Sequence, residues 1–320
     1  MTKENLIERW QEIPQHGMGI RTIRIDGICI PELYIGKNDA GNKCLVLYDA
    51  NTQSKLRNSN MENISFEYDD VNGAFVLLLK NDYFNSLFDD LVLSIYNALK
   101  PIEEREHSTQ MFLTAMSKWF EIFRRGRNEI MSEEKIRGLI AELIVLDDLM
   151  EDANPQNINE IVESWKGPDK KRHDFEMESE HIEVKSKKSD ALKVKISSEF
   201  QLQEPEGMGL KLIVVSIDQN PEGDVSIPYL FESIRNRITQ NLGDLTDFYD
   251  KLVQMNLNPV DLSPYQGYLY SVSEVVKFDV LLHEGFPRIV PPMLGEGISG
   301  VSYSLNIGEI DEFLISRDEY

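Results

Sequence analysis

Cysteine is scarce in this chain of 320 residues, which contains only Cys29 and Cys44. Two distant cysteines form neither a CxxC pair nor a disulfide framework, and this usage is typical of a reducing compartment. Long apolar runs are also missing, since stretches such as 75–79 and 212–215 are far too short to cross a bilayer. The N-terminus lacks the cationic and apolar pattern of a signal peptide. We therefore expect a cytoplasmic protein without a membrane contact.

Several common functional motifs are absent as well. The five histidines show no zinc-type spacing; they are His16, His107, His173, His181 and His283. Neither a GxGxxG string nor a Walker A string occurs, so ATP is not an expected ligand. A Ser-His-Asp arrangement cannot be seen from the sequence alone.

Positive charge is in deficit, because 33 Lys and Arg face 55 Asp and Glu and leave a net charge of −22. Phosphate contacts require Lys and Arg, so this balance is unfavourable for tight nucleic-acid binding. Residues 165–195 differ, with nine basic against seven acidic side chains. This local patch favours a protein that binds DNA weakly alone or gains DNA affinity from a partner. The acidic remainder leaves open another role, in which the surface itself mimics DNA.

The composition, 41% hydrophobic and 28% charged, predicts a packed globular protein. Strand-like segments separated by Gly, Asn and Asp turns fill residues 20–79 and predict a β-rich N-terminal domain over 1–105. Pro101 and the charged run 103–106 mark the expected boundary. Residues 106–320 are predicted to form a second domain that ends in a β extension.

The second domain is expected to be of the α/β (α+β) class, with a mixed sheet flanked by helices. A helix over 132–150 begins at Ser132, a good N-cap residue. The elements predicted after it are a strand near 158–165, a hairpin over 172–187, strands at 192–197 and 210–217, helices at 227–241 and 244–256, strands at 267–272, 276–282 and 301–307, and an acidic helix at 309–316.

The predicted hairpin separates its residues by chemistry when it is folded around a turn at Ser179-Glu180. One face is then apolar (Phe175, Met177, Ile182, Val184) and the other is charged (Asp174, Glu176, Glu183, Lys185). In this register Asp174 lies opposite Lys185, and both lie near Glu183. Two carboxylates with a lysine can hold Mg²⁺ against a phosphate and steady an attacking water. The alternative is a charged face that is simply solvated.

Two further acids need to be placed. Glu142 lies in the apolar helical segment 139–146, so its carboxylate should face a compensating group such as a cation, unless it reaches water at the rim. Asp169 follows Gly167 and Pro168, and we expect it in a turn rather than in the site. The loop Lys170–Arg172 could contact phosphates, although such surface cations are commonly just solvated.

Glu142, Asp174 and the string Glu183-Val184-Lys185 together resemble the PD-(D/E)XK nuclease superfamily, of restriction-endonuclease-like fold. The whole chain further resembles an uncharacterised prokaryotic family of PD-(D/E)XK motif proteins encoded near restriction–modification and phage-defence genes. The matching stretches are 138–149, 165–168 followed by 174–175, 182–186 and 197–202, within roughly residues 110–220.

This resemblance implies an endonuclease that hydrolyses DNA phosphodiesters with Mg²⁺, for which Mn²⁺ can substitute. Asp174, Glu183 and the Val184 backbone carbonyl would hold the metal, and Lys185 would orient the water or stabilise developing charge. Glu142 would be the helix-borne carboxylate near the metal, and Gln201 a polar residue beside it. The resemblance also implies defence-system partners such as an ATPase or a methyltransferase, and a homodimer is compatible with it. A nuclease fold that only binds or assembles is the alternative, beside the acidic DNA mimic.

Overall fold

The computed structural model describes residues 1–14, 16–48, 58–124, 130–169 and 171–320. The chain divides into two compact units: unit 1 contains residues 1–128 and 236–260, and unit 2 contains residues 129–235 and 261–320. The predicted boundary at 105/106 falls inside unit 1, because α3 (Arg105–Arg124) packs against α2 (Asn85–Leu99) and α7 (Leu245–Gln254). None of the helices within the described ranges has the length and apolar character needed to cross a membrane.

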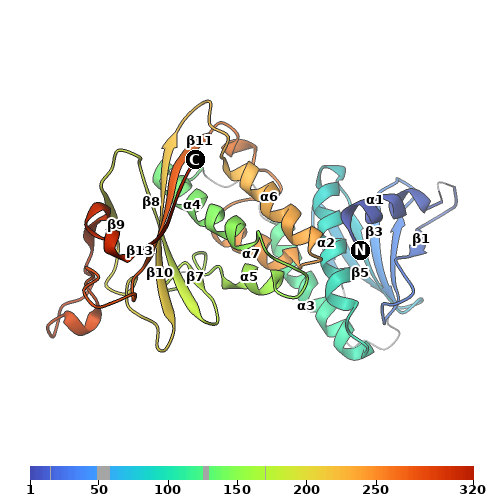
Figure 1. Cartoon of the computed structure of the whole chain (residues 1–320). Coiled ribbons are helices and arrows are strands. Elements are labelled where there is room, and N and C mark those ends of the chain that lie inside the picture. The colour runs from blue at the N-terminus through green and yellow to red at the C-terminus, as the bar shows by residue number, and fades with distance from the viewer. Residues whose placement is uncertain (15, 49–57, 125–129, 170) are drawn as a thin grey trace. The chain divides into compact units, whose positions relative to one another are not determined.

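Unit 1 is built on a six-stranded antiparallel sheet in the order β1-β2-β3-β6-β5-β4. Figure 1 labels its strands β1, β3 and β5. Its strands are β1 (Arg21–Arg24), β2 (Leu33–Lys37), β3 (Lys43–Tyr48), β4 (Asn58–Asn60), β5 (Ile64–Asp69) and β6 (Ala74–Leu79). Helix α1 (Lys3–Glu12) and the 3-10 turn η1 (Asp82–Phe84) belong to the same unit. The predicted β-rich character of residues 20–79 is thus confirmed, although the strand expected over residues 20–30 covers only residues 21–24.

Unit 2 is built on a mixed five-stranded sheet in the order β13-β11-β10-β8-β7. Its strands are β7 (Phe175–Glu176), β8 (Glu180–Lys187), β10 (Gly209–Gln219), β11 (Tyr270–Asp279) and β13 (Leu314–Glu319). Strands β8 and β10 run parallel, and the other neighbours are antiparallel. This arrangement confirms the predicted mixed α/β sheet.

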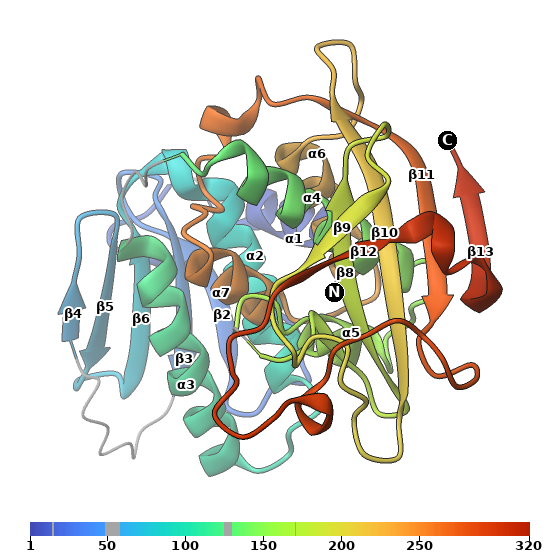
Figure 2. The same ribbon diagram turned by 90° about the vertical axis from the view of Figure 1, so that its left-hand side faces the viewer.

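The two faces of this sheet are covered differently. Helix α4 (Glu133–Leu149) packs against β8 and β10 on one face. A two-stranded sheet of β9 (Lys193–Ile196) and β12 (Tyr303–Asn306) lies on the other, where its apolar side chains join those of β10 in one cluster. Figure 1 shows β8 and β10 between α4 and β9, and Figure 2 shows β9 and β12 in front of the sheet. Helix α6 (Ile227–Gln240) follows β10 in the chain.

Three predicted elements of unit 2 differ in the structure. Residues 158–164 form helix α5 (Ile158–Ser164) instead of a strand, and Ile158 and Val162, four residues apart, bury the same side. The two strands predicted at 267–272 and 276–282 form the single strand β11. It pairs with β10 along its length, with a register shift between Ser216 and Ile217 of β10.

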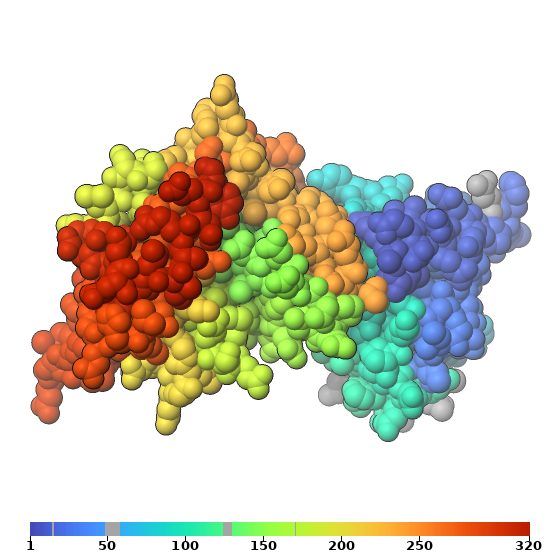
Figure 3. Space-filling model, viewed as in Figure 1, coloured from blue at the N-terminus to red at the C-terminus, as the bar shows by residue number. Residues whose placement is uncertain are grey.

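The expected C-terminal helix at 309–316 is also wrong. The segment forms the 3-10 turns η4 (Ile307–Glu309) and η5 (Asp311–Phe313), and then β13 pairs with β11. Hydrogen bonds to the free edge of β11 are available only in the folded sheet, and they override the local helical pattern. In the space-filling view the last residues, coloured red, lie at the surface of unit 2 (Figure 3). Two short 3-10 turns, η2 (Ser263–Tyr265) and η3 (Pro291–Met293), complete the unit.

Candidate functional site

The hairpin of β7 and β8 carries the predicted site, but its register differs from the prediction. Phe175 pairs with Ile182, and the Met177 N–H donates to the Glu180 carbonyl at 3.0 Å. The turn therefore lies at residues 178–179, one residue earlier than expected. Continuing the pairing places Asp174 level with Glu183 and not with Lys185. The two faces keep their predicted composition, because a two-residue register shift preserves the alternation of side chains.

Asp174 lies directly before the first residue of β7, Phe175. Strand β7 does not reach Val184, and the Val184 N–H donates instead to Asp174 Oδ2 at 2.8 Å. The Asp174 carbonyl accepts hydrogen bonds from the backbone N–H groups of Lys166 (2.7 Å) and Gly167 (3.1 Å). One residue thus ties the edge of β8 to the loop that follows α5, and its partly exposed carboxylate is fixed in position.

Glu183 and Lys185 project from β8 on the face shared with Leu212 and Val214 of β10. The Lys185 ammonium contacts Glu183 Oε1 at 2.5 Å, and these side chains are 14% and 1% exposed. Glu183 Oε2 is buried and has no hydrogen-bond partner. A simple solvated face is therefore excluded at Glu183, and one of its two oxygens is left available for a ligand.

Glu142 reaches the same region from α4. The Trp165 indole N–H donates to Glu142 Oε2 at 2.8 Å, and Trp165 is fully buried. A Cβ atom added to Gly167 would lie 2.2 Å from the same Oε2, so a larger residue there would force the Glu142 carboxylate to move. These supporting roles of Trp165 and Gly167 were missed from the sequence, although both residues lie in one of its matching stretches.

The four charged groups influence one another. Burial raises the pKa of Glu142 to about 8, and the negative charge of Asp174 adds to this rise. Burial also raises the pKa of Asp174, and raises that of Glu183 well above its usual range. Burial alone would lower the pKa of Lys185, but the nearby carboxylates of Glu183 and Asp174 outweigh it and raise that pKa. The carboxylates are thus held close enough to repel one another.

A divalent cation fits this charge pattern. Three ionised carboxylates against one ammonium leave two negative charges, which equals the charge of one Mg²⁺. Oxygen ligands are those that Mg²⁺ prefers, and Glu183 Oε2 is a buried oxygen without a partner. Within the described ranges, only His173, Glu176 and His181 bring three such ligand atoms within 4.8 Å of one another. The carboxylate oxygens of Glu142, Asp174 and Glu183 therefore do not all lie within 4.8 Å of one another.

The remaining predicted residues lie as follows. The side-chain oxygen of Gln201 accepts a hydrogen bond from the Ser197 N–H at 2.7 Å. This bond is local and does not connect Gln201 with the charged residues, so a role for Gln201 beside the site stays a prediction. Asp169 lies in a turn, as predicted, with its N–H bonded to the Lys166 carbonyl at 3.0 Å. Of the basic loop 170–172, Lys170 lies outside the described residues, and the Arg172 guanidinium lies 5.7 Å from the centre of the Phe200 ring.

Two histidines meet beside the site, although their spacing in the sequence gave no metal signal. His173 Nδ1 and His181 Nδ1 are 3.0 Å apart. Burial, followed by the charges of His181 and Arg172, lowers the pKa of His173 to about 4. The hairpin fold supplies this proximity, because it brings residues eight positions apart onto neighbouring strands.

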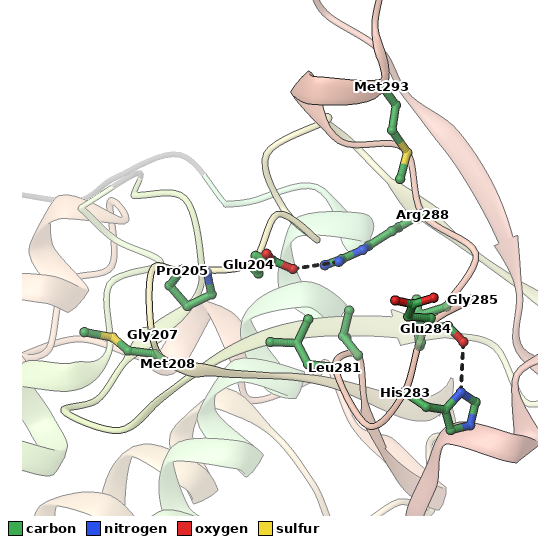
Figure 4. Close-up of a pocket in the computed structure, with 12 residues that line it drawn as sticks. Glu204, Pro205, Gly207, Met208, Leu281, His283, Glu284, Gly285, Arg288 and Met293 are labelled. Atoms are coloured by element: carbon green, nitrogen blue, oxygen red, sulfur yellow. Dashed lines mark hydrogen bonds and ion pairs between the residues drawn. The ribbon is translucent and has the colours of Figure 1, made fainter.

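A cavity of about 640 Å³ lies elsewhere in unit 2 (Figure 4). Arg288 at its wall is paired with Glu204 at 2.8 Å and also donates to the Leu202 carbonyl. Met208 and Phe286 contribute apolar surface. None of the four charged residues of the predicted site lines this cavity, and its arginine is already neutralised. We therefore do not assign the metal chemistry to it.

A family model described as "Putative PD-(D/E)XK family member, (DUF4420)" matches residues 6–308. No curated protein and no solved structure matches the chain. The matched range includes all four charged residues of the site as well as Trp165 and Gly167.

Proposed function

Because the chain belongs to this DUF4420 family of PD-(D/E)XK members, we propose that it is a divalent-metal-dependent DNA endonuclease. The observation that carries the proposal is the buried, unpartnered Oε2 of Glu183, within a group of three carboxylates and one lysine. A buried carboxylate oxygen without a partner costs free energy, which a bound cation would offset. An ion bound at this oxygen would supply the metal chemistry that the proposed endonuclease requires.

Each residue has a distinct role in this proposal. Asp174 and Glu183 would hold the metal, with the Val184 carbonyl as a further oxygen. When bound, Mg²⁺ or Mn²⁺ would neutralise phosphate charge and make a water more acidic. Lys185 would donate to the attacking water or to a phosphate oxygen on which negative charge grows. Glu142, held by Trp165, would add negative charge near the metal, and we keep Gln201 as a polar neighbour of the site.

The charge distribution defines the expected setting. A chain with a net charge of −22 has few side chains that can neutralise phosphates, so we propose weak DNA binding by the protein alone. A basic partner, such as an ATPase or a methyltransferase of a prokaryotic restriction or phage-defence system, would supply the missing affinity. We place the protein in the cytoplasm, and a homodimer is compatible with the proposal.

One observation favours a second function, a nuclease fold that binds or assembles without cutting. The Glu183 side chain is fully buried and its Oε1 is already occupied by Lys185. If that ion pair persists in the presence of metal, neither residue is free for chemistry. The two functions differ in whether the carboxylates bind a divalent ion.

Metal binding is the direct test. Calorimetric titration of the full chain with Mn²⁺ should show one site that requires Asp174 and Glu183, together with an increase in Tm through mass action. The double variant Asp174→Ala/Glu183→Ala should lose both responses and should not nick plasmid DNA. A matched control, Glu178→Ala/Asp190→Ala, removes two exposed acids and should behave like the parent. Unchanged Mn²⁺ binding by the first double variant would refute the site, and the absence of Mn²⁺ binding by the parent would favour the assembly function.

A further inference from the structure

We propose that His173, Glu176 and His181 form a second metal site, one that takes a transition-metal ion of the Zn²⁺ class. The proposal does not depend on the nuclease function, because its ligands are different residues. It assigns a chemical role to a histidine pair that the endonuclease proposal does not use.

The geometry of the three side chains converges on one point. The two Nδ1 atoms are 3.0 Å apart, and one ligand atom from each of the three residues lies within 4.8 Å of the others. Zn²⁺ binds imidazole nitrogen at about 2.0–2.1 Å in tetrahedral geometry, which places two nitrogens about 3.3 Å apart. The observed pair needs to open by only a few tenths of an ångström to take an ion.

A histidine–histidine hydrogen bond is the simpler explanation, but it accounts for less. His173 is 1% exposed, and in this buried position one neutral hydrogen bond between the two rings would stabilise the pair by only about 1 kcal/mol. The hydrogen bond also leaves the Glu176 carboxylate unexplained. A coordinate bond at each Nδ1, with a carboxylate oxygen as the third ligand, explains all three positions.

The ligand types select the class of ion. Imidazole nitrogens suit Zn²⁺, Co²⁺, Ni²⁺ and Cu²⁺, whereas Mg²⁺ prefers oxygen ligands. Three protein ligands leave a fourth position for water. This site and the pair Asp174 and Glu183 should therefore discriminate between transition-metal ions and Mg²⁺.

The position of the ligands indicates what the ion would do. Glu176 and His181 are a cross-strand pair of the hairpin, and His173 lies in the bend before β7. An ion bound to all three would fasten this bend to β8. Asp174 follows His173 directly, so the ion would also restrict the residue whose carboxylate caps the Val184 N–H. We assign the ion a positioning role.

The test uses the full chain after removal of metals with a chelator. Titration with Co²⁺ should give the visible absorption of a low-symmetry, histidine-bound ion at one equivalent, and Zn²⁺ should displace it while excess Mg²⁺ should not. Zn²⁺ should also raise Tm. His181→Ala, at a partly exposed position, should abolish the absorption and the Tm shift, and Glu176→Gln should weaken both.

Two controls separate this site from others. His107→Ala, an exposed histidine, should keep the Co²⁺ spectrum, and so should Asp174→Ala/Glu183→Ala, which removes the proposed nuclease ligands. Circular dichroism establishes that each variant is folded, and Glu176→Gln serves if a histidine variant is not. The proposal is overturned if Zn²⁺ binds the parent no more tightly than it binds folded His181→Ala. Loss of the spectrum in the Asp174→Ala/Glu183→Ala variant would move the ion to the carboxylate site and also overturn it.

Discussion

The Trp165 indole N–H donates a 2.8 Å hydrogen bond to Glu142 Oε2 and so links the end of α5 to the middle of α4. The bond stabilises the charged form of a carboxylate that burial disfavours, and it opposes the rise in the pKa of Glu142. Gly167, two residues after Trp165, leaves the space that the carboxylate occupies. These two residues hold the Glu142 carboxylate in a position where the charges of Asp174 and Lys185 influence it.

Gly167→Ala should destabilise the protein, because its new Cβ would lie 2.2 Å from Glu142 Oε2. Forcing a group into a packed site costs about 1–3 kcal/mol. The free energy of unfolding, measured with urea, should fall by this amount. Gly138→Ala is the matched control, since its Cβ meets nothing within 4 Å and it lies inside α4. There alanine should stabilise the helix by about 0.5–1 kcal/mol. Equal effects at the two glycines would contradict the proposed packing of Glu142.

Stability of the metal-free protein should fall as the pH rises from the ordinary carboxyl range to about 8. Burial raises the pKa of Glu142 to about 8 in the folded state, so the folded protein keeps a proton that the unfolded chain releases. More protons bound in the folded state mean that the free energy of unfolding decreases with pH over this window. The Glu142 contribution is on the order of a few kcal/mol.

Glu142→Gln should make this pH dependence shallower, which urea unfolding at several pH values would measure. Glu178→Gln, at an exposed position of the hairpin turn, should leave the dependence as it is in the parent. If Glu142→Gln and the parent lose stability in parallel, the titrating group is not Glu142. Saturating Mg²⁺ should also reduce the dependence, because a cation favours ionised carboxylates.

Lys185→Met should slow DNA cleavage by about 10²–10³ while changing DNA affinity little, since one charge-stabilising donor is lost mainly in the transition state. The fold should survive, because the raised pKa of Glu183 allows that carboxyl group to become neutral when its partner is removed. Lys185→Arg should restore little activity, since a planar guanidinium does not replace a compact ammonium. Single-turnover cleavage and DNA binding would be measured side by side. If Lys185→Met cuts as well as Lys188→Ala, an exposed-lysine control, Lys185 has only a structural role.

Binding of the isolated chain to duplex DNA should be weak and should depend little on salt. Each neutralised phosphate adds about 0.9 to the slope of log affinity against log salt, and the acidic surface supplies few such contacts. Lys171→Ala, in the basic loop, should reduce the slope by roughly that amount, whereas Lys135→Ala on α4 should not. Fluorescence anisotropy over a range of salt concentrations provides the measurement. A steep slope in the parent that neither variant changes would place the DNA contacts elsewhere.

Local patterns predicted the fold where one face of an element is apolar. The alternation in 174–185 predicted which side chains of the hairpin strands share a face, even though the turn lies one residue earlier than expected. The same reasoning failed at 158–165 and 309–316. The first segment forms a short helix instead of the expected strand, and the end of the second pairs with a free sheet edge instead of forming the expected helix. Periodicity is informative when many residues repeat it, and it decides little in segments of seven or eight residues.

The sequence by itself determined the residue types of the candidate site: Asp174, Glu183 and Lys185 on one face of a hairpin, and Glu142 in an apolar helix. Only the tertiary structure decided what surrounds them. Trp165 and Gly167 support Glu142, Glu183 Oε2 is buried without a partner, and His173 meets His181. The physical reason is that alternation within a strand depends on neighbouring residues, whereas burial and hydrogen-bond satisfaction depend on segments that are distant in the chain.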